Sequence, residues 1–135
     1  MKQTIPKLKK KLDQIFSLYI RLKNSNDFGV ATCFTCGKLD SYKRLQNGHF
    51  QSRKFLATRF DEENCQVQCS GCNIFRYGEQ YKFAVNLNAK YGEGTAEELQ
   101  RKARQTIKIS RTDYEDYIGY YKRLVDNLKK EKGIA

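Results

Sequence analysis

Residues 64–73 read Asn-Cys-Gln-Val-Gln-Cys-Ser-Gly-Cys-Asn, and this run contains one Cys-x₂-Cys pair, Cys69 and Cys72. A second pair with the same spacing, Cys33 and Cys36, precedes it across a loop of 32 residues. Two such pairs supply the four thiolates of a closed tetrahedral zinc site. The spacing therefore predicts a structural Zn²⁺ held by Cys33, Cys36, Cys69 and Cys72.

Two other interpretations of these cysteines are buried small side chains and a disulfide framework. Disulfides are typical of secreted chains, but no apolar signal segment follows Met1, and the sequence is already basic by Lys7. We therefore expect a reducing compartment, in which zinc is favoured over disulfides. The fifth cysteine, Cys65, is interpreted as a buried strand residue, with a spare zinc ligand as the alternative.

The net charge of +11 is concentrated at the two ends of the 135-residue chain. Residues 1–23 carry seven basic side chains and one acidic, residues 24–99 carry nine of each, and residues 100–135 carry ten basic and five acidic. Lysine-rich helices are usually solvated faces, but so uneven a distribution favours a polyanionic partner. Nucleic acid is the leading interpretation and a membrane surface the alternative. No run of about 18 apolar residues occurs, so no membrane-spanning segment is expected.

The hydrophobic periodicity predicts an α+β protein of a single domain with three parts. Residues 1–28 would form a basic N-terminal helix, with Pro6 in its first turn. Residues 29–80 would hold short strands, long loops and the zinc site, with a helix beginning near Ser70. Residues 81–135 would form a C-terminal helical extension.

Two capping boxes, one beginning at Thr95 and one at Thr112, predict helix starts within the C-terminal extension. The second helix carries an aromatic and aliphatic stripe from Tyr114 to Leu128. Such a stripe is usually core, although a base-stacking platform or a homodimer interface is also consistent with it.

His49, the only histidine, lies between the cysteine pairs in Asn47-Gly48-His49-Phe50, and Asn64 and Asn73 follow it. The order His, Asn, Asn resembles the HNH, or ββα-metal, nuclease motif, and residues 64–73 reproduce that family's Asn-x-Gln-x-x-Cys-x-x-Cys-Asn pattern. The cysteine spacing is similar to that of Holliday-junction resolvases of the endonuclease VII type. The surrounding sequence is most similar to the phage NinG/Rap recombination proteins.

This resemblance implies a zinc-stapled ββα-metal core that cleaves DNA phosphodiesters at branched recombination intermediates such as Holliday junctions and D-loops. It places the protein in the cytoplasm of a phage-infected host. His49 would be the general base, because neutral imidazole accepts protons near pH 7. Asn73 would bind a catalytic Mg²⁺ or Mn²⁺, and Asn64 would hold the loop that follows His49. The four-cysteine zinc has no open position and would only clamp the fold.

The chain departs from many HNH enzymes at Gly48, where an Asp or His usually binds the metal. The missing ligand would be a backbone carbonyl, the amide of Asn47, an acid such as Asp40, or the DNA phosphate. Arg53, Lys54 and Arg59 follow the motif and would contact phosphates, or would form a solvated basic loop. The helix at the N-terminus would add phosphate contacts from Lys7, Lys9, Lys10 and Lys11.

Two alternatives to a branch-selective endonuclease remain open. One is a non-catalytic zinc module that binds DNA, with a purely structural His49. The other is a general HNH nicking enzyme without branch selectivity, acting as a monomer. Symmetrical resolution of a junction would instead require a homodimer with two active sites.

Overall fold

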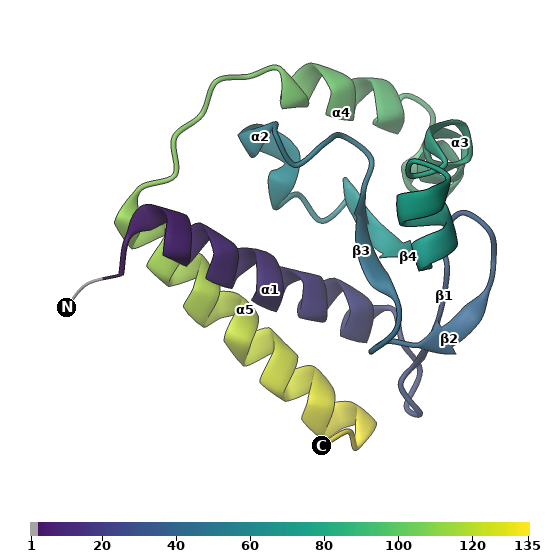
Figure 1. The fold of residues 1–135 in the computed structure, drawn as a ribbon, viewed down its shortest axis with the longest axis horizontal. Helices are drawn as coiled ribbons and strands as arrows, with labels where there is room; N and C mark the ends of the chain where they lie inside the picture. Colours follow the sequence, from purple (N-terminus) through teal and green to yellow (C-terminus); the bar gives the residue numbers. More distant parts are fainter. Residues whose placement is uncertain (1–2) are drawn as a thin grey trace.

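The computed structural model describes residues 3–135. The first two residues of the stretch in which no signal segment was found, Met1 and Lys2, lie outside the described residues. Helices and two small antiparallel sheets make up the fold, which confirms the predicted α+β class. In Figure 1, α1 (Ile5–Lys23) lies beside α5 (Arg111–Lys132), so the two ends of the chain pack together. The strands and the remaining helices lie on the other side of α1.

Helix α1 begins where the sequence predicts. The Thr4 side chain accepts a hydrogen bond from the backbone N–H of Lys7 at 3.4 Å, and Pro6 lies in the first turn, where its missing N–H leaves no gap. One face of the helix is apolar and buried. The residues of this face are Leu8, Leu12, Phe16, Tyr19, Ile20 and Leu22.

Helix α5 completes the core that α1 begins. The ring of Phe16 meets that of Tyr121 edge to face, with centroids 5.0 Å apart, and Tyr114 and Val125 are buried beside them. The Glu62 carboxylate accepts hydrogen bonds from the hydroxyls of Tyr19 and Tyr121. The buried residues of the α5 stripe are thus intramolecular core packed against α1, as the usual interpretation of such a stripe predicts, while Tyr117 stays 46% exposed and a homodimer interface remains a prediction.

The two predicted capping boxes identify the right helices but the wrong caps. Helix α5 is capped by Ser110, which exchanges both capping-box hydrogen bonds with Asp113, two residues before the predicted cap. Helix α4 (Thr95–Ala103) follows Gly94, whose φ of 92° suits glycine. The Thr95 hydroxyl donates back to the Gly92 carbonyl instead of capping the helix.

The strands form two separate antiparallel pairs. Strands β1 (Val30–Thr32) and β2 (Leu39–Ser41) make a hairpin, and β3 (Gln46–His49) pairs with β4 (Cys65–Gln68), which places His49 opposite Cys65. The long β3–β4 connection contains the short helix α2 (Leu56–Arg59). All of β4 is buried, and Cys65 is only 1% exposed, so its assignment as a buried strand residue is confirmed.

After β4 the chain makes one turn of π-helix, η1 (Gly71–Phe75), and then α3 (Gln80–Tyr91). The helix expected from Ser70 is thus only this short turn. Phe50 packs with residues of α3 and α4 in a second apolar cluster, whose other members are Phe83, Leu87, Ala96 and Leu99. None of the helices within residues 3–135 has both the length and the apolar character needed to cross a membrane.

Candidate metal centre and adjoining groove

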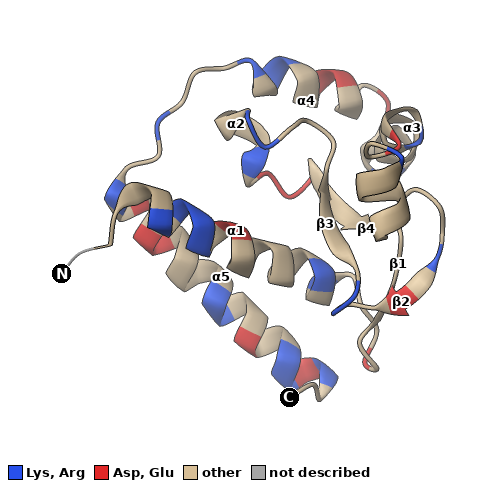
Figure 2. Cartoon of the chain, viewed as in Figure 1, with Lys and Arg blue, Asp and Glu red and all other residues tan. Residues whose placement is uncertain are grey.

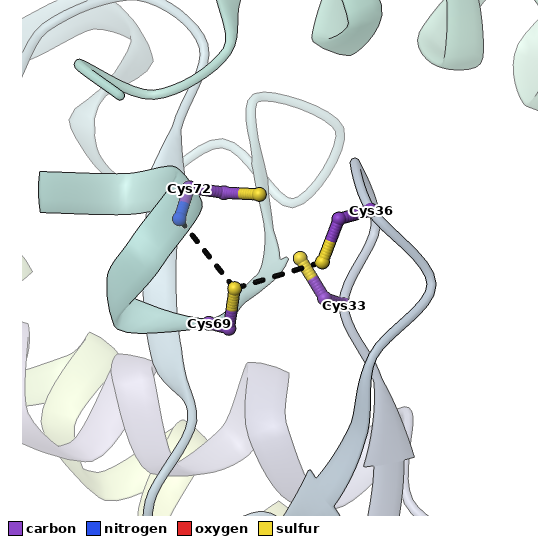
Figure 3. A group of neighbouring side chains, drawn as sticks. All are labelled: Cys33, Cys36, Cys69 and Cys72. Carbon is purple, nitrogen blue, oxygen red and sulfur yellow. Dashed lines mark hydrogen bonds between the residues drawn. The ribbon is translucent and has the colours of Figure 1, made fainter. Parts of the chain in front are cut away.

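The four paired cysteines meet at one point, as predicted. Cys33 directly follows β1 and Cys36 lies in the β1–β2 turn, while Cys69 directly follows β4 and Cys72 belongs to η1 (Figure 3). Their sulfur atoms all lie within 4.8 Å of one another. The Sγ atoms of Cys36 and Cys69 are 3.7 Å apart, close to the roughly 3.8 Å between sulfurs of a tetrahedral site with Zn–S bonds of about 2.3 Å. The donor set and its spacing therefore fit a structural zinc ion.

Hydrogen bonds favour the thiolate at one of these sulfurs, Cys33. Burial raises the pKa of the Cys33 thiol, but bonds from the Thr35 hydroxyl and from backbone N–H groups outweigh burial and lower the pKa to about 6. Burial raises the pKa of Cys36 and Cys72, and the Arg76 guanidinium places a positive charge 3.5 Å from the Cys72 sulfur. Thr35 and Arg76 are supporting residues that the motif does not reveal.

A groove of about 900 Å³ runs along β3 beside the metal centre. Its walls come from α1, from the loop after β3, and from the segment that leaves η1. The side chains expected to carry chemistry are only partly gathered there: Asn64 and Arg59 lie outside its lining, as do the four lysines of α1. The lining includes Asp13, Ser17, Arg21, Gln46, Asn47, His49, Arg53, Lys54, Phe55, Asn73 and Tyr77.

His49 ends β3 and is half-buried in the groove. Its Nε2 lies 3.0 Å from the Arg59 carbonyl oxygen. Because a carbonyl only accepts hydrogen bonds, this contact assigns the proton of the neutral ring to Nε2 and leaves Nδ1 as the basic nitrogen. Burial, aided by the charges of Arg53 and Arg59, lowers the pKa of His49 to about 4, so the ring is neutral at pH 7.

We expect the His49 ring protons to titrate near pH 4 in NMR spectra, which the single histidine makes unambiguous. An unfolded chain binds this proton near pH 6.5, whereas the folded chain does not until about pH 4. The contribution of His49 to stability is therefore complete above pH 6.5 and is lost as the pH falls through 4. A titration near pH 6.5 would contradict the burial of the ring.

Asn64 is fully buried and holds the loop that follows His49. Its Oδ1 accepts from the backbone N–H of Gln51 at 2.7 Å, and its Nδ2 donates to the carbonyls of Gln51 and Thr58 at 3.1 and 3.0 Å. Three side-chain contacts to backbone fix both limbs of this loop. Asn64 therefore positions the groove wall and does not line the groove.

Amide oxygens are the main hard donors of the groove. The Nδ2 of Asn73 donates to Gln46 Oε1 at 2.8 Å, which turns the Asn73 oxygen away from that contact. The Oδ1 of Asn47 is buried and has no hydrogen-bond partner within residues 3–135. Asp40 bonds Arg44 instead and lies outside the groove lining. Of the two side chains considered as substitutes for a metal ligand at position 48, Asn47 lines the groove and Asp40 does not.

The absence of a side chain at Gly48 has a steric cause. A Cβ atom there would lie 1.9 Å from Oε1 of Gln68, a fully buried side chain that donates to Thr35 and to the Gly78 carbonyl. An aspartate or histidine at this position would have to displace that amide. The space that a side chain at position 48 would need is therefore filled by Gln68.

We expect Gly48→Ala to destabilise the fold by about 1–3 kcal/mol in urea unfolding, because Gln68 must move and leave its partners. Gly119→Ala, within α5, is the matched control: its Cβ meets nothing closer than 3.5 Å, and alanine favours helix by about 0.5–1 kcal/mol. A Gly48→Ala variant as stable as the wild type would show that Gln68 does not constrain this position.

Arg59 plays a different part from the one expected. Its guanidinium donates to both carboxylate oxygens of Asp13, at 2.9 and 2.5 Å, and to the Arg53 carbonyl at 2.9 Å. These bonds tie α2 to α1 and neutralise the carboxylate in the groove wall. Arg53 and Lys54 are exposed and line the groove, whereas Arg59 is held in contacts within the fold; phosphate contact by these residues stays a prediction.

These features define a small α+β protein with a four-cysteine metal centre beside a polar groove. The family model of the Bacteriophage Lambda NinG protein matches residues 2–131. The chain therefore belongs to the NinG family, and the predicted family membership is confirmed. A search of curated proteins and a search of solved structures each gave no match.

Proposed function

We propose that this protein is a metal-dependent DNA endonuclease of the HNH type that cuts branched recombination intermediates, including Holliday junctions and D-loops. The observation that carries the proposal is the groove itself. It collects a neutral histidine, free amide oxygens and two exposed cations next to a four-cysteine centre, in a chain of the NinG family. His49 and Asn73 are the first and last members of the His, Asn, Asn pattern, and Asn64, the middle member, holds the loop after His49 from outside the groove.

In this mechanism His49 is the general base. Its Nδ1 takes a proton from the attacking water while the Arg59 carbonyl holds Nε2 and fixes the ring orientation. The amide oxygens of Asn73 and Asn47 would hold a Mg²⁺ or Mn²⁺ ion, together with the DNA phosphate. That ion supplies charge stabilisation for the leaving oxygen. Asp13 is the carboxylate among the lining residues, and it is paired with Arg59. The protein therefore supplies little negative charge for binding the ion, and the DNA phosphate would supply the rest.

The four-cysteine centre serves the groove indirectly. It joins the β1–β2 turn to η1 and thereby places Asn73, which directly follows Cys72. His49 is connected to this clamp through the β3–β4 ladder, where it faces Cys65. Four cysteine ligands leave a zinc ion no open position for water, which is why a second metal is needed for the reaction.

Basic side chains extend the groove toward longer DNA. Figure 2 shows Lys and Arg gathered along the first half of α1 and on the loop before α2. Lys9 stands one turn before Asp13, so it continues the helix face that lines the groove. Lys7, Lys10 and Lys11 are exposed on the neighbouring faces of α1.

If these lysines contact phosphates, changing Lys7, Lys9, Lys10 and Lys11 to Gln should flatten the salt dependence of DNA affinity. Each lost phosphate contact removes about 0.9 from the slope of log K against log salt on B-form DNA. Affinity for branched and linear DNA should fall alike, and fluorescence anisotropy at several salt concentrations measures both. A control variant with Lys122, Lys129 and Lys130 of α5 changed to Gln tests whether the loss of positive charge elsewhere on the protein flattens the slope to the same extent. An unchanged slope in the α1 variant would show that these lysines are only solvated.

The proposal is tested by incubating the protein with labelled four-way junction, flap and linear duplex in the presence of Mg²⁺ or Mn²⁺. Cleavage of the junction and flap ahead of duplex is expected. Equal cutting of all three would indicate a nicking enzyme without branch selectivity. No cutting, with DNA binding retained, would indicate a zinc-stabilised DNA-binding module, an alternative favoured by the half-buried position of His49 and its bond to Arg59.

A further inference from the structure

The stretch from the end of η1 to the first turn of α3 exposes three aromatic rings. Phe75 is 77% exposed, Tyr77 is 87% exposed and Tyr81 is 76% exposed. Aromatic side chains grouped at a surface mark a binding site more often than isolated exposed ones do. Of the three, Tyr77 lines the groove that holds His49 and Asn73.

The backbone holds Tyr77 in a strained position. Tyr77 and Glu79 have φ values of 53° and 50°, on either side of Gly78 with φ of 88°. Left-handed backbone at two non-glycine residues is unfavourable and persists only where the surroundings enforce it. Here the Gly78 N–H donates to the Cys72 carbonyl at 2.7 Å, and buried Gln68 donates to the Gly78 carbonyl at 2.9 Å. Contacts from the metal centre and from β4 therefore fix the backbone conformation next to Tyr77.

The loop after β3 brings a different chemistry to the same groove. It offers the exposed cations Arg53 and Lys54, with the Lys54 ammonium 5.0 Å from the centre of the Phe55 ring. Asp13, the carboxylate of the lining, is neutralised by Arg59. An exposed ring and exposed positive charge in one groove suit a ligand that has a flat aromatic part and an anionic part. A nucleotide in a DNA strand has both.

We infer that Tyr77 is a stacking platform for a base with a free face at the branch point of bound DNA, while Arg53 and Lys54 hold the adjoining phosphates. This inference rests on the proposed function and deepens it by naming a residue that selects the substrate. A base within duplex DNA is already stacked on both faces and offers nothing to Tyr77. A base at a junction, flap or gap has a free face. Stacking of that face on an aromatic side chain contributes favourable binding free energy.

The test measures binding without added Mg²⁺ or Mn²⁺, so that it does not depend on cleavage. The probes are a flap and a four-way junction with 2-aminopurine at the branch, and a linear duplex with the same base paired. Tyr77→Ala is expected to weaken binding to both branched probes about tenfold, and to leave duplex binding within about twofold. It should also abolish the quenching of 2-aminopurine that stacking produces. Tyr77→Phe keeps the ring and should behave as the wild type.

Phe28→Ala is the matched control, because Phe28 is 90% exposed but lies outside the groove lining. Retained zinc and an unchanged melting temperature show that each variant is folded. If Tyr77→Ala binds branched DNA as the wild type does, or loses duplex affinity in equal measure, the inference is overturned while the nuclease proposal stands. If the wild type binds none of the probes, both are overturned. If it binds with the Tyr77 effect but never cuts when Mg²⁺ is added, only the nuclease proposal fails.

Discussion

A Cys69→Ser variant is expected to lose both its zinc and its folded state. Cys69, Cys33 and Cys72 are buried members of the main apolar cluster, so a defect at the centre spreads directly into the core. Zinc contributes about 10–16 kcal/mol of apparent binding energy in small zinc-folded peptides, and this energy is folding energy. Whole domains of ordinary size are stable by only about 5–15 kcal/mol. Elemental analysis should find one zinc per wild-type chain and none in the variant.

The near-ultraviolet circular dichroism of the variant should collapse, because the aromatic packing between α1 and α5 depends on the same cluster. Cys65→Ser makes the same chemical change at a buried cysteine outside the centre, and it should keep its zinc and its spectrum. A Cys69→Ser protein with the spectrum and melting temperature of the wild type would refute a structural role for the metal. So would wild-type protein purified without chelator that contains no zinc.

A His49→Ala variant should cut DNA about 10²–10⁴-fold more slowly than the wild type, because a positioned general base contributes that much to proton transfer. The base acts in the chemical step and adds little to ground-state binding, so the Kd for DNA should stay near the wild-type value. Zinc content should also be unchanged, since His49 is not among the clustered cysteines. Single-turnover cleavage and anisotropy measure the two quantities separately.

Asn73→Ala offers the comparison with a metal ligand. Its cleavage should fall as well, but high Mn²⁺ should restore part of it, whereas no metal concentration should rescue His49→Ala. If His49→Ala instead loses affinity in step with activity, the histidine is a binding or structural residue, and its bond to the Arg59 carbonyl is then its main role.

Much of this fold follows from local patterns in the sequence. The four-cysteine cluster follows from spacing alone, because Cys-x₂-Cys turns present two sulfurs to one point whatever surrounds them. The start of α1 follows from Pro6 and the apolar period, whereas the helix ends at Lys23, before the boundary at residue 28 drawn from the sequence. The caps of α4 and α5 do not, because several hydroxyl and glycine residues stand near each start and only the loop conformation chooses among them.

The groove is less accessible to sequence reasoning because its walls come from distant segments. Arg59 and Asp13 are separated by 46 positions, and nothing near Arg59 shows that its charge is already paired. Gln68 fills the space at Gly48 only through the register of β3 and β4. Asp13, Ser17 and Arg21 were missed as lining residues, although their spacing of four places them on one face of α1. Tyr77 carries no motif at all; only its backbone and its position draw attention to it.

The pairing of α1 with α5 also sets an order of events during synthesis. The apolar face of α1 is translated before its partner face on α5, which follows about 100 to 110 residues later. All residues of the cysteine centre and of the β3–β4 pair have been translated by residue 72. Zinc can therefore be bound before α5, the partner of α1, has been synthesised. A nascent chain truncated before residue 111 would therefore hold the cysteine centre but carry Leu12 and Phe16 without the residues of α5 that pack in their cluster. Such a fragment would be a target for chaperones and proteases.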